Sequence, residues 1–368
     1  MTETTVVGGG IVGASVAYHL AREGVETTLI DRGDEGRATD AGAGIVAPGT
    51  SGRPGDDPWY DLATAAADHY PDLVDRLRRE QDGDPGYERC DYLDVAMAAD
   101  EVAAFDETGR AAPGIEGVME VSPRDAREAF PPLEEPLRAR RYRGVGRVNG
   151  RLVTAALRRA GEAHGLTVES GDVEAIRVSD GAVSGVAVDG EFRRAGAVVV
   201  AGGAWSPAFA DDLGVDVAVE PQRGQIAHLD VGDADTGSWP IVSAFREHYL
   251  VPFPGGRVVA GATRERGVGF DPRATAGGVR EVLDEALRVA PGLADAELLE
   301  VRVGLRPLSA DGLPLLGAVP GASGAYLATG HGPSGLTLGP YSGRCVAALV
   351  RGAEPPTDLS AFDPARLA

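Results

Sequence analysis

Three glycines near the start of the chain have the spacing of a turn that binds a nucleotide. Gly8, Gly10 and Gly13 follow an apolar stretch that predicts a strand, and they precede a run of small and apolar residues that predicts a helix. In such a turn the first glycine permits the tight bend, the second lets the backbone approach a pyrophosphate, and the third lets the helix pack closely on the strand. The free N–H groups at the helix start then favour the phosphate charge.

An acidic residue stands where a ribose would bind. Asp31 ends a second predicted strand and lies 18 residues after Gly13, a distance at which a carboxylate can accept hydrogen bonds from ribose hydroxyls. A purely structural glycine turn is the alternative, but strand, turn, helix, strand and acid all occur here in order. We therefore predict an adenine dinucleotide site. This motif alone does not distinguish FAD from NAD.

Periodic and alternating apolar patterns predict the elements that position this site. The predicted helices span residues 58–80, 101–110, 150–165, 276–290 and 335–350. The predicted strands span residues 86–98, 166–168, 172–178, 182–188, 197–201, 217–229, 240–252, 256–263, 297–304 and 325–329. A second glycine turn, at Gly202 and Gly203, is expected to start a helix. We expect the arginines between Arg138 and Arg143 to lie in a solvated loop and strand edge.

The order of these elements predicts an α/β fold of two domains. Residues 1–80, 145–216 and 304–368 would form a Rossmann-like nucleotide-binding domain of separate segments. Residues 81–144 and 217–303 would form a β-rich substrate domain built on an antiparallel sheet.

The net charge of the chain limits the classes of partner that it can bind and suggests the kind of cell that it comes from. There are 56 acidic against 35 basic residues, which gives a net charge of −21, and every basic residue is arginine. We interpret this composition as that of a protein from a high-salt cytoplasm, where screening weakens repulsion between carboxylates. A GC-rich genome is the alternative source of the arginine bias. The acidity argues against nucleic acid or an anionic membrane as a partner.

The cysteines and the apolar runs indicate a cytoplasmic protein. Cys90 and Cys345 are too few for a disulfide framework or a metal cluster. The N-terminus leads directly into a predicted strand, so we expect no secretory signal. No apolar stretch reaches the roughly 18 residues of a spanning helix. We therefore expect no metal and no membrane span, and the sequence is compatible with a homo-oligomer.

Four blocks of the chain resemble the D-amino-acid oxidase superfamily of FAD enzymes, and within it the glycine oxidase and sarcosine oxidase group. They occur in the order of that family and together cover nearly the whole chain. The blocks are residues 8–31, residues 198–206, residues 304–307 with 311–314, and residues 329–337. Residues 249–252 followed by 261–263 are similar to glycine oxidase in particular.

The resemblance implies FAD as the cofactor. It assigns to the cofactor site Gly8, Gly10, Ile11, Val12, Gly13, Asp31, Arg32, Thr39, Ala43, Gly44, Val173, Ala201, Gly202, Gly203, Trp205, Gly330, His331, Gly332, Gly335, Leu336 and Thr337. The small residues of segment 39–44 would pass beside the flavin. The start of the last helix would face the flavin pyrimidine, where it can stabilise negative charge. Sarcosine oxidases tether the flavin through a cysteine that corresponds here to about Gly304, so FAD should be non-covalent.

The resemblance also implies how a substrate is bound. Arg306 offers a bidentate fork for a substrate carboxylate, and the hydroxyl of Tyr249 would share that carboxylate. The alternatives are an ion pair of Arg306 with a nearby acid such as Asp311, and a core position for Tyr249. His331 would lie by the flavin or serve the loop. Arg264 replaces an apolar residue of glycine oxidases; we expect it to face solvent, but in the pocket it would favour a second anionic group.

The expected reaction is oxidation of the C–N bond of glycine, a D-amino acid or a sarcosine-like amine. Hydride would pass to flavin N5, and the imine would hydrolyse to a 2-oxo acid. Electrons would then go to O₂ or another acceptor. One alternative is an FAD-dependent D-amino-acid or 2-hydroxy-acid dehydrogenase that passes electrons to a non-oxygen acceptor. The other is a non-catalytic flavoprotein.

Overall fold

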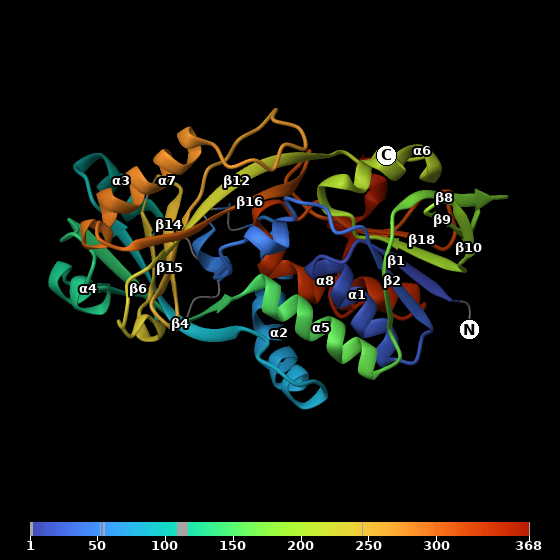
Figure 1. Ribbon diagram of the computed structural model, residues 1–368, viewed down its shortest axis with the longest axis horizontal. Helices are drawn as coiled ribbons and strands as arrows, with labels where there is room; N and C mark the ends of the chain where they lie inside the picture. Colours follow the sequence, from blue (N-terminus) through green and yellow to red (C-terminus); the bar gives the residue numbers. More distant parts are fainter. Residues whose placement is uncertain (1–2, 52, 54–55, 109–116, 245, 368) are drawn as a thin grey trace.

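The computed structural model describes residues 3–51, 53, 56–108, 117–244 and 246–367. Among these residues the strands form sheets of six, three and nine strands. The six-stranded and nine-stranded sheets lie toward opposite ends of an elongated molecule (Figure 1). The predicted α/β fold is confirmed.

The six-stranded sheet has the order β17-β18-β11-β1-β2-β7. Its strands are β1 (Thr4–Val7), β2 (Thr27–Asp31), β7 (Thr167–Ser170), β11 (Ala197–Val200), β17 (Leu315–Ala318) and β18 (Ala325–Thr329). All neighbours pair in parallel except β17, which is antiparallel to β18. Because β1 and β11 are buried, they are built almost wholly from β-branched residues. Their carboxyl ends meet at Val7 and Val200, which brings the two glycine turns side by side.

Four helices pack together beside this sheet. They are α1 (Ile11–Arg22), α2 (Trp59–Glu80), α5 (Gly150–Ala163) and α8 (Gly335–Val350). The helix α1 contacts both α5 and α8, and only Arg22 among its residues is not buried. Close packing on several sides explains the small residues along the helix, since larger side chains there would force these helices apart; they are Gly13, Ala14, Ser15, Ala17 and Ala21.

A hairpin extends from the carboxyl end of β7. Its strands β8 (Val173–Ser179) and β9 (Ala182–Val188) are those predicted, and β10 (Glu191–Arg194) adds a third strand. Asp180 and Gly181 form the turn with φ of 52° and 74°. This left-handed conformation matches the twist of a two-residue hairpin and suits Asp-Gly.

The nine-stranded sheet carries the other half of the molecule. In the order β16-β12-β15-β14-β13-β4-β6-β3, with β5 paired to β6, its strands are Glu297–Ser309, Val219–Asp230, Arg257–Gly261, His248–Phe253, Ile241–Ala244, Tyr87–Ala96, Arg138–Val148, Ile45–Val46 and, for β5, Met119–Val121. The sheet is antiparallel except where β4 pairs with β13. Alternate residues therefore point to two different faces.

The two faces of this sheet have different neighbours. On the outer face Leu93, Val242 and Leu250 form a core with α7 (Ala276–Val289) and α4 (Pro123–Ala129); α3 (Ala99–Thr108) packs beside β4. On the inner face a second cluster joins β12, β14 and β15 to Ala43 and Ala47, which follow the 3₁₀ turn η1 (Ala38–Ala41). The inner face thus looks toward the nucleotide-binding half.

The structure corrects several expectations. The arginines at 138–143 lie within the long strand β6, where Arg140 is 5% exposed and lies 4.1 Å above the ring of Phe105. The turn after β11 begins a 3₁₀ helix, Gly203–Phe209, which contains Pro207, and the short α-helix Ala210–Leu213 follows it. The expected boundaries at 144 and 303 fall inside β6 and β16. The division into two domains otherwise stays a prediction.

Two further expectations concern helices. The helix expected at 101–110 is α3, and residues 109 and 110 lie outside the described residues. In the part of the chain that the structure describes, no helix has the length and apolar character needed to cross a membrane.

Candidate functional site

A cavity of about 490 Å³ lies between the glycine turn and the inner face of the nine-stranded sheet. The glycine turn, segment 38–45, the turn after β11 and the start of α8 form one part of its wall. Residues of β12, β14 and β16 form the other part. The cavity therefore extends from Asp31 and Val173 in the nucleotide-binding half to Tyr249 and Arg306 on the inner face.

The glycine turn leaves the start of α1 open to an anion. Gly8 has φ of 100°, and a Cβ on Gly13 would overlap the carbonyl oxygen of Gly8. The N-cap Gly10 supplies no side-chain cap, and the first turn of α1 holds no acidic residue. Thr39 Oγ1 accepts the N–H of Ile11 at 3.1 Å. The remaining N–H groups and the helix dipole suit a pyrophosphate.

Asp31 is held ionised at the end of β2. Its Oδ2 lies 2.6 Å from the guanidinium of Arg158 and 3.0 Å from that of Arg37. Burial alone would raise the pKa of Asp31, but the N–H of Gly33 and the guanidinium of Arg158 outweigh it, so the pKa lies below its usual value. An ionised carboxylate at this position can accept hydrogen bonds from ribose hydroxyls.

The two arginines beside Asp31 were not among the residues predicted for the site. Arg37 follows Asp31 by six positions, so a local ion pair was open to inference. Arg158 reaches Asp31 from α5 across 127 positions and also donates to the carbonyl oxygen of Gly9. Only the packing of α5 against α1 brings it there.

The small residues of segment 38–45 serve close packing on protein as well as on a ligand. A Cβ on Gly42 would lie 2.5 Å from Cδ1 of Leu336, and one on Gly44 would overlap the carbonyl oxygen of Val148. Gly44 also has φ of 85°. The segment therefore passes between the cavity and the start of α5 with little room for side chains.

The start of α8 directs the positive end of its helix dipole toward the cavity, and the turn before it contributes a neutral imidazole. Gly335 and Leu336 line the cavity at the first turn of this 16-residue helix. His331 also lines it and is 5% exposed, and burial lowers the pKa of His331 to about 4. Its Nε2 is buried without a hydrogen-bond partner among the described residues.

Tyr249 and Arg306 meet on the inner face. They come from β14 and β16. Tyr249 lies opposite Gly261, whereas Arg306 lies opposite Gln222 and its guanidinium extends to Gly224. A Cβ on Gly261 would lie 3.0 Å from the Tyr249 hydroxyl, and one on Gly224 would lie 2.5 Å from the guanidinium of Arg306. Burial lowers the pKa of Arg306 and raises that of Tyr249. The guanidinium stays charged and the phenol stays protonated, so both can donate to a carboxylate.

Arg306 has no carboxylate partner among the described residues. Its Nη1 donates to the carbonyl oxygen of Thr263 at 3.0 Å and lies 3.4 Å from Gln222 Oε1. Asp311, the acid nearest to it in sequence, pairs instead with Arg366 at 2.7 Å. The guanidinium is half-buried, its hydrogen-bond acceptors are neutral, and it lines a cavity. It is therefore available for an anionic ligand.

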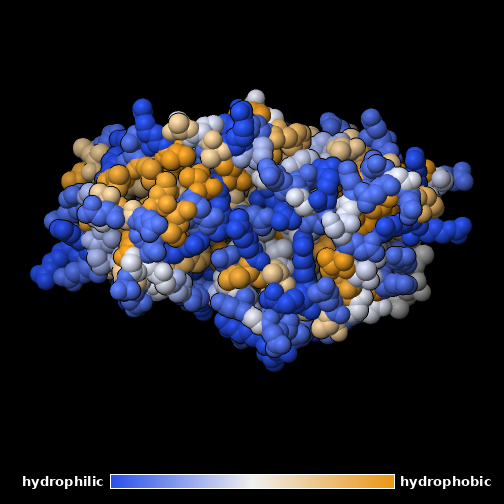
Figure 2. Space-filling model, in the orientation of Figure 1, coloured by the Kyte–Doolittle hydropathy of each residue, from blue (hydrophilic) through white to orange (hydrophobic). Residues whose placement is uncertain are grey.

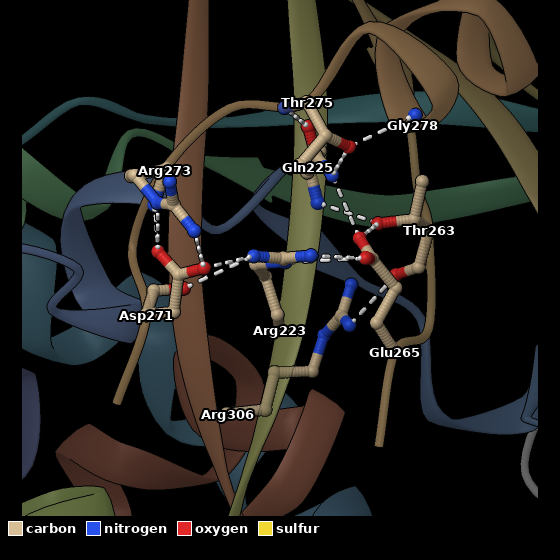
Figure 3. A network of polar contacts seen from close by, with 9 residues as sticks. All are labelled: Arg223, Gln225, Thr263, Glu265, Asp271, Arg273, Thr275, Gly278 and Arg306. Carbon is tan, nitrogen blue, oxygen red and sulfur yellow. Dashed lines mark hydrogen bonds and ion pairs between the residues drawn. The ribbon is translucent and has the colours of Figure 1, made fainter. Parts of the chain in front are cut away.

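A network of polar contacts fixes the turn that holds Arg306 (Figure 3). Oγ1 of Thr263 accepts the N–H of Gln225 at 3.0 Å and donates to Glu265 at 2.8 Å. Arg223, 6% exposed, pairs with both Glu265 and Asp271. The carbonyl of Thr263 therefore points at Arg306 from a rigid frame, which leaves the guanidinium few alternative positions.

Arg264 lies at the rim of the same cavity. It lines the cavity wall, yet its side chain is 36% exposed and its Nε pairs with Glu247 Oε2 at 2.9 Å. The expectation that Arg264 faces solvent is therefore only half met, because the positive charge also acts on Arg306 and Tyr249.

The structure brings most of the residues predicted for the site to one cavity. Those on its wall are Gly8, Gly10, Ile11, Val12, Asp31, Arg32, Thr39, Ala43, Gly44, Val173, Ala201, Gly202, Gly203, Trp205, Tyr249, Arg264, Arg306, His331, Gly332, Gly335 and Leu336. Three others are not on it. Gly13 packs on Gly8, Gly330 turns the chain after β18 with φ of 77°, and Thr337 donates to the carbonyl oxygen of Ile45. Their roles toward a cofactor stay predictions.

The comparisons with known proteins agree on one family. The sequence profile described as FAD dependent oxidoreductase (DAO) matches residues 3–349. A Bacillus subtilis protein named "Uncharacterized oxidoreductase YurR" is 43% identical over 370 residues, which cover 99% of each chain. The iminodiacetate oxidase structure from Chelativorans sp. BNC1 is 38% identical with a TM-score of 0.92 and covers 98% of each chain. The glycine oxidase structure from Geobacillus kaustophilus is 30% identical with a TM-score of 0.91, and covers 100% of this chain and 98% of that one.

Proposed function

This chain belongs to the family of FAD-dependent oxidoreductases, and on that premise we propose that it oxidises the C–N bond of a small amino acid. The membership confirms the predicted resemblance and favours FAD over NAD as the cofactor. The single observation that carries the proposal is Arg306, a half-buried cation without a carboxylate partner in the described chain, beside Tyr249 in the cavity that also holds the glycine turn.

Different residues of the cavity would bind different parts of FAD. The glycine turn and the start of α1 would hold the pyrophosphate, and Asp31 the adenosine ribose. The start of α8 would favour negative charge on the reduced ring. When bound, FAD supplies an electron sink for the hydride of the substrate α-carbon.

Arg306 and Tyr249 would orient the amino acid. The guanidinium and the phenol donate hydrogen bonds to the substrate carboxylate, which fixes the α-carbon in one place and lowers the entropy cost of reaction. The amine loses a hydride and a proton to become an imine, and water converts the imine to a 2-oxo acid with release of ammonia or an amine. In this scheme no side chain needs to act as a general base.

We further propose that the substrate carries a second carboxylate. Arg264 places another guanidinium at the rim of the same cavity, where its one ion pair within the described residues is with the exposed Glu247. The similarity to an iminodiacetate oxidase supports a secondary amine with two carboxylates. Glycine is the second candidate, supported by the similarity to glycine oxidase.

Anaerobic reduction of the flavin tests the proposal. The purified holoenzyme is mixed with iminodiacetate, glycine, sarcosine, D-alanine, L-proline or glycolate, and loss of the oxidised flavin absorbance is followed. We expect bleaching by an amino acid, fastest with iminodiacetate. Bleaching by glycolate alone would favour a 2-hydroxy-acid dehydrogenase, and no bleaching by any of these compounds would favour a non-catalytic flavoprotein.

A variant of Arg264 tests the second carboxylate. Arg264→Gln should lower the rate of flavin reduction with iminodiacetate by about tenfold, since one charge-assisted hydrogen bond is lost, and should change the rate with glycine little. Arg266→Gln is the matched control, because Arg266 is an exposed neighbour that does not line the cavity. Equal losses with both substrates would contradict this role.

A further inference from the structure

A second cavity, of about 280 Å³, lies on the inner face beyond the cavity already described. Along β12, Gly224 lines the first cavity and His228 lines the second, and along β16 the corresponding residues are Arg306 and Arg302. Between them Ile226 and Val251 form part of an apolar cluster with Ala43. The second cavity is therefore a separate compartment of the same sheet face.

The second cavity is rich in arginine. Arg257 and Arg302 reach it from β15 and β16, and both pair with the single carboxylate of Glu300, at 3.3 and 2.6 Å. Arg151, in the first turn of α5, lines the cavity and makes no ion pair among the described residues. Three guanidinium groups thus share one carboxylate, in a protein whose overall charge is strongly negative.

The wall carries four other charged residues, and three of them, Asp40, Glu88 and Arg147, are in ion pairs. Arg147 is 2% exposed and pairs with Glu88. Asp40 pairs with Arg37, and Asp84 accepts the N–H of Gly86. The ion pairs contribute little net charge, but Asp84 keeps its negative charge, so Arg151, Arg257 and Arg302 face two carboxylates, Glu300 and Asp84, and a positive excess remains.

His228 adds a donor that lacks an acceptor. Its side chain is 4% exposed, and Nδ1 lies 3.3 Å from Nη1 of Arg257. A guanidinium can only donate, so Nδ1 must accept and the proton of the neutral ring must sit on Nε2. Nε2 is buried without a partner among the described residues, as is Nε of Arg302. An unpaired buried donor is costly, and a ligand acceptor would remove that cost.

We propose that this second cavity binds a small dianion, such as phosphate or a short dicarboxylate, between Arg151, Arg257, Arg302 and His228. Its volume of about 280 Å³ equals that of several water molecules at about 30 Å³ each, which leaves room for a small anion. Thr39 and Gly42 line both cavities. Arg302 also donates to the carbonyl oxygen of Asp40 at 3.4 Å, so this arginine links the proposed anion site to the segment that borders the first cavity.

Calorimetric titration of the FAD-loaded enzyme tests the site. Inorganic phosphate and malonate are titrated separately in a buffer low in chloride. We expect one equivalent of at least one anion to bind, and the anion that binds identifies the ligand as a phosphate or a dicarboxylate. The double variant Arg151→Gln/Arg257→Gln should weaken binding about tenfold or more. Arg194→Gln removes an exposed charge on β10 and should bind like the wild type.

Three results would overturn the proposal. The first is that neither anion binds. The second is that the double variant, with normal flavin content, binds as tightly as the wild type. The third is that Arg306→Gln abolishes binding while the double variant keeps it, which would place the anion in the flavin cavity. Arg151→Gln alone removes an exposed side chain and should still weaken binding if the double variant folds poorly.

Discussion

At the scale of single residues, the site depends on glycines that leave space as much as on the functional side chains that fill it. Arg306 can lie flat on the inner face because Gly224 leaves its position empty, and Tyr249 has the same relation to Gly261. The resemblance to a family predicted both residues for the site. It included Gly261 but not Gly224, and it did not show that these glycines lie beside the two side chains, because strand register decides which residues face each other across β12, β14, β15 and β16.

Gly224→Ala should displace Arg306 without removing its charge. The new Cβ would lie 2.5 Å from three atoms of the guanidinium group. A shift of about 1 Å in a positioning group can cost about a hundredfold in rate, so we expect a loss of that order in kcat/KM for the best amino acid. Gly277→Ala is the matched control, since its Cβ would meet no atom within 4 Å. A wild-type rate for Gly224→Ala would show that the guanidinium need not lie there.

At the scale of elements, short sequence patterns predicted most helices and strands correctly. Contacts between distant segments could not be predicted from such patterns. The strand-turn-helix unit at the N-terminus and the Asp-Gly hairpin follow from local chemistry, and both were predicted from it. The strand β6 was missed because its arginines suggested a solvated segment. In the folded chain Arg140 stacks on Phe105 and Arg147 pairs with Glu88, so both guanidinium groups are buried with partners. Such partners come from distant segments and leave no local pattern.

Gly13→Ala should weaken the binding of FAD. A methyl group there would overlap the carbonyl oxygen of Gly8, which is backbone and cannot rotate away, so α1 must move from β1. Overpacking of this kind costs about 1–3 kcal/mol, which corresponds to a rise of about fivefold to about 150-fold in the Kd for FAD. Fluorescence titration of the apoenzyme with FAD measures this change. An unchanged Kd in the variant would remove Gly13 from the account of the turn.

At the scale of the whole molecule, acidity dominates the surface and neutral histidines lie inside. Figure 2 shows a face covered largely by hydrophilic residues, with hydrophobic residues gathered mainly over the end that holds α7, β14 and β15. His69, His228 and His331 are each at most 5% exposed. Burial lowers the pKa of each to about 4. The composition indicated the surface charge, but only the fold shows which histidines are buried.

These histidines should make the protein less stable in mild acid. Their folded pKa values lie below the unfolded value of about 6.5, so the unfolded chain binds more protons between about pH 6.5 and pH 4. Their contribution to the free energy of unfolding is complete above pH 6.5 and is lost as the pH falls, by up to about 3 kcal/mol each. Burial raises the pKa of Asp94 to about 6, so this group has the opposite effect on stability. It is one group, whereas three histidines lower the stability in acid.

Urea unfolding at constant salt, compared at pH 7 and pH 5, measures the effect. The free energy of unfolding should be lower at pH 5, and His69→Gln should show a smaller difference between the two pH values than the wild type. An equal or greater stability of the wild-type protein at pH 5 would contradict this account of its buried imidazoles.

The central claim is that Arg306 binds the carboxylate of an amino acid that is oxidised at its C–N bond. The most direct test compares anaerobic flavin reduction by the best amino acid with reduction by its amide, which keeps the C–N bond but lacks the charge. The wild type should prefer the acid by about a hundredfold or more, because two charge-assisted hydrogen bonds are at stake, and Arg306→Gln should lose most of that preference. Equal rates with acid and amide in the wild type, or a full preference in Arg306→Gln, would contradict the claim.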